Sequence, residues 1–280
     1  MPRWFLNFAF VMLVLSAVFA GELSAAPKST ESQKNKTPTK KLPLPGEVFR
    51  VDGCTAFLIP PRQSVAGRTT PWVWYAPTLP GLPADSEKWM FERFTAAGIA
   101  IAEIDVGESY GSPEGRAKYT ALYRTLVDKW GMSPKPVLLG RSRGGLMLYA
   151  WACENPHKVG AIAGIYPVCD LTSYPGIETA AKAYGLTAGE LRGELRKHNP
   201  LDRLQPLAKA GIPLFAIHGD ADRVVPLERN SGEMARRYAA LGGKMDLVVP
   251  KGQGHNMWRG FFECQALVDF VIKHARSSNE

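Results

Sequence analysis

Cysteine and histidine are scarce in this sequence, which has four cysteines and five histidines among 280 residues. No spacing between them matches a zinc site, and no cysteine has the flanking residues of a catalytic nucleophile. The sequence therefore predicts neither a metal centre nor a thiol enzyme. The four cysteines, which allow three complete disulfide pairings or can stay free thiols, are Cys54, Cys153, Cys169 and Cys264.

The sequence also lacks a basic stripe and an internal repeat. Its formal net charge is +8, but lysine and arginine are scattered and are not interleaved with aromatic residues. Without Arg3 the charge is +7, of which residues 21–45 carry +3, so that residues 46–280 carry +4. Such a mildly basic region does not have the footprint of a nucleic-acid-binding protein, and we expect no nucleic acid partner.

The N-terminal residues differ in composition from the rest of the chain. Arg3 is followed by an uncharged apolar run to residue 20, which ends in the small-residue pattern of a cleavage site. Residues 1–20 are predicted to be a secretory signal peptide, and we expect a secreted or periplasmic protein without stable membrane insertion after cleavage. The alternative is an uncleaved N-terminal membrane anchor, because about 17 apolar residues can just span a bilayer.

Residues 21–45 are rich in lysine, threonine, serine and proline and have no apolar periodicity. They are predicted to form a disordered basic linker, followed by a catalytic domain over residues 46–280. In this domain short apolar runs alternate with amphipathic stretches. Strands are expected at residues 48–51, 55–59, 72–76, 99–104, 136–139, 159–166, 212–217 and 245–249. This alternation predicts a mostly parallel central sheet that is flanked by helices.

One segment interrupts the alternation. About forty-four residues separate the strand that ends near Pro167 from the strand that begins at Ile212. This segment is predicted to contain a helical insertion at about residues 170–206, with helices at 177–184 and 188–197. The insertion is expected to act as a lid over the site, and the alternative is a passive helical decoration.

The segment Gly140-Arg141-Ser142-Arg143-Gly144-Gly145 directly follows an apolar strand. A strand that runs through Gly-x-Ser-x-Gly into a helix is a nucleophile elbow, in which a tight turn exposes the serine hydroxyl. Side chains at Gly140 and Gly144 are expected to collide with neighbouring backbone. The motif therefore predicts Ser142 as a nucleophile.

Two downstream motifs supply an acid and a base in the order that the elbow requires. The first is His-Gly-Asp-Ala-Asp-Arg-Val-Val-Pro at residues 218–226, and the second is Gly-Gln-Gly-His at residues 252–255. Both follow apolar strands, whose carboxyl ends meet at one edge of a parallel sheet. We expect His255 to be the general base and Asp222 to orient it, with Asp220 as the competing acid.

These three motifs are similar to those of the α/β-hydrolase superfamily, and the resemblance covers residues 46–276. The dienelactone-hydrolase and prolyl-oligopeptidase-like branches are the most similar. The resemblance implies an α/β-hydrolase fold and an oxyanion hole made of two backbone N–H groups. One donor is expected at Arg143, and the other at Thr78 or Leu79, because Pro77 and Pro80 have no N–H. Many members have His-Gly where this sequence has Pro77-Thr78.

Arg141 and Arg143 flank the nucleophile on either side. They are predicted either to attract an anionic substrate or to form ion pairs with acids such as Asp105 and Glu108. Four further side chains could line an apolar or sugar-stacking pocket or belong to the core, namely Tyr110, Tyr166, Met257 and Trp258. Of these, Tyr110 and Trp258 are taken with Arg141 as candidate substrate-binding residues.

The triad predicts a serine hydrolase that acts through an acyl-enzyme and needs no metal or organic cofactor, and the predicted signal peptide makes it a secreted one. The expected substrates are carboxylic esters, as small molecules or on a carbohydrate. The alternative is a peptidase of the prolyl-oligopeptidase type acting on short peptides, although the chain lacks the large N-terminal propeller with which those enzymes select peptides. A third hypothesis is a non-catalytic binding protein on the same scaffold. The oligomeric state is not predicted.

Overall fold

The computed structural model describes residues 38–63, 68–77 and 79–277, and these described residues form one compact unit. The predicted signal peptide and most of the predicted linker lie outside the described residues. Within the described part of the chain, no helix is long and apolar enough to cross a membrane.

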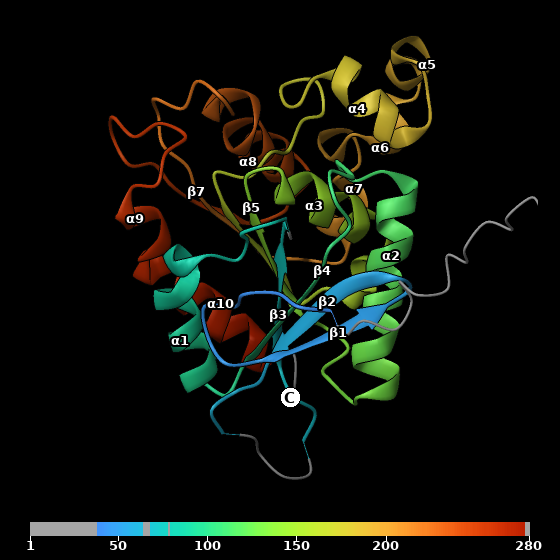
Figure 1. Cartoon of the computed structure of the whole chain (residues 1–280). Coiled ribbons are helices and arrows are strands. Elements are labelled where there is room, and N and C mark those ends of the chain that lie inside the picture. Colours follow the sequence, from blue (N-terminus) through green and yellow to red (C-terminus); the bar gives the residue numbers. More distant parts are fainter. Residues whose placement is uncertain (1–37, 64–67, 78, 278–280) are drawn as a thin grey trace, which may run out of the picture. The chain divides into compact units, whose positions relative to one another are not determined.

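A central sheet of eight strands organises this unit (Figure 1). The strands are β1 (Glu47–Val51), β2 (Cys54–Ile59), β3 (Trp72–Ala76), β4 (Ala100–Ile104), β5 (Val137–Arg141), β6 (Ala161–Ile165), β7 (Leu214–Ile217) and β8 (Met245–Val248). Their order in the sheet is β1-β2-β4-β3-β5-β6-β7-β8. Strand β2 pairs antiparallel with both β1 and β4, and all other neighbouring strands of this sheet pair parallel. The predicted α/β-hydrolase fold is confirmed.

The helices cover both faces of the sheet (Figure 1). They are α1 (Lys88–Ala96), α2 (Pro113–Arg124), α3 (Gly144–Glu154), α4 (Ile177–Tyr184), α5 (Ala188–Gly193), α6 (Leu195–His198), α7 (Gln205–Lys209), α8 (Ser231–Ala240), α9 (Arg259–Phe262) and α10 (Gln265–Ser277). On one face α1 and α10 enclose a core, and on the other α2, α3, α7 and α8 enclose a second one. Strand β6 is buried on both faces, which explains its continuous apolar sequence.

The insertion between β6 and β7 contains α4, α5 and α6. The helix predicted at residues 188–197 is divided into α5 and α6, and the break follows Gly193, a residue type that weakens helices. A small apolar cluster joins α4 and α5 to Leu146 of α3 and to Val225. The insertion therefore packs on the start of the elbow helix.

The packed unit begins before residue 46, where the predicted linker was expected to end. Leu42 and Leu44 pack against the core on the α1 and α10 side, and the Lys40 Nζ donates a hydrogen bond to the Leu79 carbonyl at 3.3 Å. The two leucines lie in a lysine- and proline-rich run, so the composition of this segment concealed their contact with the core.

Candidate active site

Ser142 lies on the sharp turn between β5 and α3, with a φ of 50°, which is rare for a residue with a side chain. The Gly145 N–H closes this turn on the Ser142 carbonyl at 2.9 Å. A Cβ atom at Gly144 would lie 2.1 Å from the Ala76 carbonyl oxygen, and one at Gly145 would lie 2.5 Å from that of Val168. At Gly140 the closest approach is 3.0 Å. The steric demand is therefore greatest at Gly144 and Gly145, whereas the sequence drew attention to Gly140 and Gly144.

The structure brings the three predicted catalytic residues into one hydrogen-bonded chain. The Ser142 Oγ lies 2.9 Å from Nε2 of His255, and Nδ1 of His255 lies 2.8 Å from Oδ2 of Asp222. The three residues come from loops that follow β5, β8 and β7, so the parallel sheet brings them to one edge. In this arrangement a carboxylate orients an imidazole that can take the serine proton.

The Asp222 carboxylate is held by more than the histidine. Its Oδ1 accepts hydrogen bonds from the backbone N–H groups of Val224 and Val225, at 2.9 and 2.8 Å. Burial raises the pKa of Asp222, but hydrogen bonds from His218, His255 and the Val225 N–H outweigh burial and hold this pKa well below its usual range. Asp222 therefore stays ionised, as an acid that stabilises an imidazolium must.

His218 and Asp220 have supporting places in the same motif. His218 is fully buried, and its Nδ1 and Nε2 lie 2.8 Å from the Ser231 Oγ and the Val225 carbonyl oxygen. Asp220 accepts a hydrogen bond from the Gly252 N–H at 2.6 Å, which connects the acid loop to the loop that carries His255. Of the two competing aspartates, Asp222 is thus the one in contact with His255.

The residues expected to form the oxyanion hole lie beside Ser142. Within the described residues, the N–H groups of Arg143 and Leu79 form no hydrogen bond, and both residues border a cavity at Ser142. The Leu79 carbonyl is held by Lys40 and by the Leu82 N–H. Thr78, the other predicted donor, lies outside the described residues.

The cavity at Ser142 has a volume of about 210 Å³. Its lining residues are Pro77, Leu79, Leu82, Arg141, Ser142, Arg143, Tyr166, His255, Asn256 and Met257. None of them comes from residues 170–206, so the predicted lid does not line this cavity. The Tyr166 ring, with its centroid 4.4 Å from that of His255, forms one wall.

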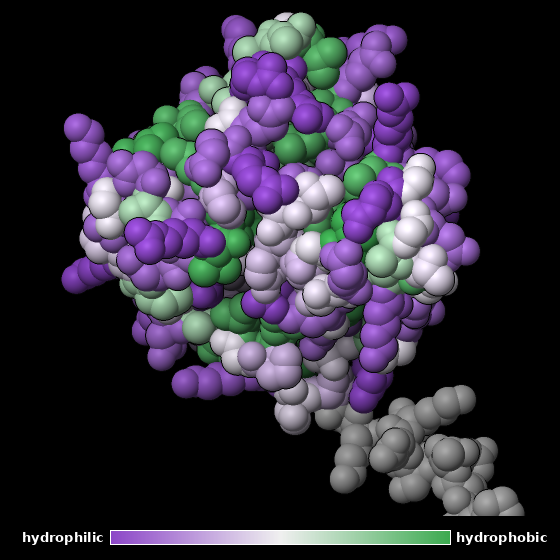
Figure 2. Space-filling model, turned by 90° about the horizontal axis from the view of Figure 1, so that it is seen from above, coloured by the Kyte–Doolittle hydropathy of each residue, from purple (hydrophilic) through white to green (hydrophobic). Residues whose placement is uncertain are grey.

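Two of the predicted substrate-binding residues do not line this cavity. The Trp258 ring packs on Phe261 and is 41% exposed, and the Tyr110 carbonyl accepts a hydrogen bond from the Tyr184 hydroxyl at 3.0 Å. Tyr110 is thereby joined to the insertion. Figure 2 looks down on the end of the molecule where α4 and α5 lie, and there hydrophilic side chains project around smaller hydrophobic areas.

Both arginines of the elbow form ion pairs. Arg143 pairs with Glu108, as one prediction had it, and its guanidinium also lies 5.8 Å from the Tyr174 ring centroid. Arg141 pairs instead with Glu87, at 2.7 Å, and its second Nη lies 3.0 Å from the Met257 Sδ. The sequence analysis missed Glu87. Glu87 lies four and seven residues before Phe91 and Phe94, a spacing that places it on the same, buried face of a helical stretch. An acid at a buried helical position is a signal that could have identified it.

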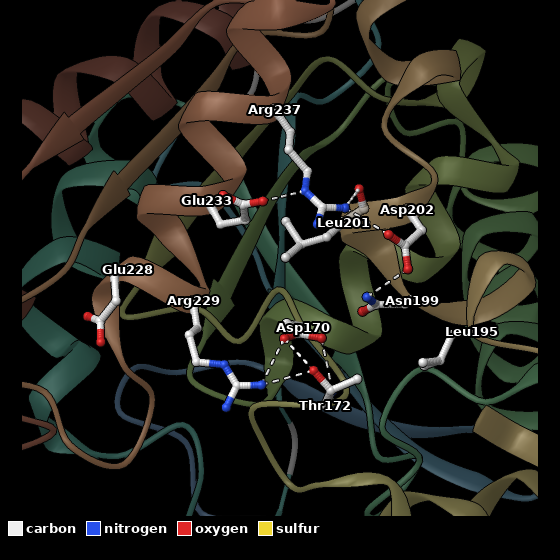
Figure 3. Close-up of a pocket in the computed structure, with 10 residues that line it drawn as sticks. All are labelled: Asp170, Thr172, Leu195, Asn199, Leu201, Asp202, Glu228, Arg229, Glu233 and Arg237. Atoms are coloured by element: carbon white, nitrogen blue, oxygen red, sulfur yellow. Dashed lines mark hydrogen bonds and ion pairs between the residues drawn. The ribbon is translucent and has the colours of Figure 1, made fainter. Parts of the chain in front are cut away.

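A larger cavity of about 350 Å³ lies between the insertion and the start of α8 (Figure 3). Arg229 lies 3.4 Å from Asp170, and Arg237 reaches both Glu233 and Asp202, at 2.6 and 2.7 Å. This cavity shares no lining residue with the one at Ser142. Its lining has four acids and two arginines, and three of the acids form the ion pairs with these arginines.

All four cysteines are free thiols. Cys153 and Cys169 are buried in the core, and burial raises the pKa of Cys153 to about 12. The sequence left open either disulfide pairing or free thiols, and the structure shows free thiols.

The comparisons with known proteins agree with this geometry. Residues 121–277, more than half of the chain, match the prolyl oligopeptidase family. The chain therefore belongs to the prolyl oligopeptidase family, whose members have the α/β-hydrolase fold described above. A search of curated proteins finds no match to the sequence.

Solved structures with the same fold include several peptidases. A puromycin-hydrolyzing peptidase of Mycobacterium tuberculosis aligns with 84% of this chain at 19% identity and a TM-score of 0.67. An acylaminoacyl peptidase of Pyrococcus horikoshii covers 86% at 17% identity and a TM-score of 0.67. Dipeptidyl peptidase 4 of Porphyromonas gingivalis covers 82% at 16% identity and a TM-score of 0.66. The alignments span only 39%, 42% and 35% of those longer chains.

Proposed function

We propose that this protein is a serine peptidase that cleaves short peptides through an acyl-enzyme. The observation that carries the proposal is the hydrogen-bonded chain from Ser142 through His255 to Asp222 at the wall of a cavity. Membership of the prolyl oligopeptidase family supports peptides over the carboxylic esters that the sequence analysis put first. The names of the structurally similar proteins, which are peptidases, support the same choice.

In the proposed reaction the Ser142 Oγ attacks the scissile carbonyl carbon while His255 Nε2 takes the hydroxyl proton. The negative charge that develops on the carbonyl oxygen is stabilised by the Arg143 N–H and by a second N–H from the loop at Leu79. His255 then protonates the leaving amine. A water molecule, deprotonated by His255, then attacks the acyl carbon; the bond to the Ser142 Oγ breaks, His255 returns the proton to this oxygen, and the acid is released. The ionised Asp222 stabilises the imidazolium in both steps.

A fluorophosphonate probe tests the nucleophile. The wild-type protein is expected to be labelled, and Ser142→Ala is expected to lose labelling while keeping its circular dichroism spectrum and melting temperature. If the folded wild type is not labelled, the proposed chemistry is contradicted, and a non-catalytic binding protein on a hydrolase scaffold becomes the leading hypothesis.

Two substrates that share the same acyl group test whether the protein cleaves amide or ester bonds. Short peptides ending in p-nitroanilide are compared with p-nitrophenyl esters of the same peptides, at equal concentrations. Because nitrophenyl esters are intrinsically more reactive, each rate is divided by its uncatalysed rate. A peptidase is expected to give the larger enhancement on the anilide, and an enhancement confined to the ester would return the assignment to esterase.

Export is a separate proposal that depends on residues 1–20 alone. N-terminal sequencing of protein expressed with its full leader is expected to begin at Gly21. An N-terminus before the apolar run would indicate the membrane anchor instead.

A further inference from the structure

Glu87 is a fully buried acid close to the proposed oxyanion hole. It ends a short 3-10 turn (Asp85–Glu87) that lies between α1 and the loop after β3, which the structure describes over residues 79–84. This loop borders the cavity with Pro77, Leu79 and Leu82. Burial of an ionised carboxylate destabilises the folded protein unless both oxygens accept hydrogen bonds. The groups that donate to Glu87 therefore indicate its role.

The two oxygens of Glu87 face two different parts of the site. Oε1 accepts hydrogen bonds from the Tyr75 hydroxyl at 2.9 Å and from the Arg141 Nη1 at 2.7 Å. Oε2 accepts from the Ala84 N–H and from the Ser86 hydroxyl, both at 2.8 Å. One oxygen is thus bound to the residue directly before the nucleophile, and the other is bound to the end of the loop.

We propose that Glu87 is a positioning residue that fixes the 79–84 loop against the nucleophile elbow, so that the Leu79 N–H and the Arg143 N–H point at the same oxyanion. This inference rests on the proposed function. Two N–H groups from separate loops stabilise a tetrahedral oxygen only if their separation is fixed before the reaction. Within the described residues, Glu87 is the side chain that hydrogen-bonds both to that loop and to Arg141.

Glu87→Gln is the informative substitution because all four partners of the carboxylate are donors. An amide keeps one oxygen and places an NH₂ group where the other oxygen was. The charged Arg141 is expected to retain the oxygen, which leaves the NH₂ group facing the Ala84 N–H. The substitution therefore releases the loop while Arg141 stays bound.

The measurement is inactivation by a fluorophosphonate, separated into the rate at saturation, kinact, and the half-saturating concentration, KI. For Glu87→Gln we expect kinact to fall roughly 10- to 100-fold with little change in KI, within the ~10²–10³-fold that the loss of one oxyanion donor costs. The matched control is Glu154→Gln, which breaks the ion pairs with Arg116 and Arg203. None of these three residues lines the cavity at Ser142. The kinact of Glu154→Gln should therefore equal that of the wild type even if the melting temperature of the variant falls.

A purely structural role predicts a different result, namely a lower melting temperature with unchanged kinact per folded molecule, and that outcome overturns the inference. If Glu87→Gln does not fold, Ser86→Ala removes one donor from Oε2, and kinact should fall about twofold or more; an unchanged value again overturns the inference. A wild type that is not labelled contradicts the proposed function instead, so the two failures are distinguishable.

Discussion

The loop after β5 and the loop after β3 both border the cavity at Ser142, but different interactions hold them in place. The first is fixed by backbone packing, since Gly144 and Gly145 lie directly against the carbonyls of Ala76 and Val168. The second is fixed by side chains, because its two ends are bound by Lys40 and Glu87. Backbone contact demands glycine at set spacings and so leaves a motif. Side-chain anchors come from distant positions and leave none.

The largest effect is expected where the triad depends on a single carboxylate. Asp222→Asn should lower kcat/KM by about 10⁴-fold, because the imidazole loses the partner that orients it and stabilises its charge. Asp220→Asn weakens only the hydrogen bond from the Gly252 N–H and should lower kcat/KM by less than about tenfold. Steady-state kinetics on both variants checks this, and equal losses would contradict the assignment of the acid.

The backbone-packed loop should not tolerate a single added methyl group. Gly144→Ala places a Cβ 2.1 Å from a backbone oxygen and should lower the free energy of unfolding by about 3 kcal/mol. Gly193→Ala is the control, because this exposed glycine in α5 has open space around it and should gain up to about 1 kcal/mol. Urea denaturation measures both, and a neutral Gly144→Ala would show that the elbow can relax.

Acid should act on stability partly through Asp222. Its pKa is lower in the folded protein than the ordinary 3.8, so its contribution is fully present above that value and is lost as the pH falls below it. Between pH 5 and pH 2 the wild type should therefore lose more stability than Asp222→Asn. Chemical denaturation at several pH values compares the slopes, and parallel slopes would contradict the assigned pKa direction.

Loss of the Lys40 side chain, which binds the loop after β3 at Leu79, should have a small effect on activity. Lys40→Met removes the 3.3 Å bond to the Leu79 carbonyl and the cation that most strongly counteracts the burial of the Glu103 carboxyl. We expect a two- to fivefold fall in kcat, whereas Lys41→Met, at the neighbouring exposed lysine, should have no effect. Equal rates for the two variants would show that Lys40 does not hold the loop.

The same contrast explains what could be predicted from sequence. The parallel strands, the elbow and the placing of Asp222 beside His255 follow from local rules, because apolar runs, glycine spacing and strand ends each determine a conformation nearby. The role of Glu87 does not, since its partners Tyr75 and Arg141 are 12 and 54 residues away. The cavity lining was predicted only in part for the same reason. Trp258 follows His255 closely in sequence but turns onto Phe261.

The free cysteines have a practical consequence. Because its four cysteines are free, the domain needs no oxidant or disulfide isomerase to reach its native state, so residues 38–277 should be obtainable from a reducing cytoplasm. Cys153 and Cys169 are buried, and thiols with raised pKa values are poor nucleophiles. They should resist alkylation until the protein unfolds, so the rate of thiol labelling measures how fast the core opens.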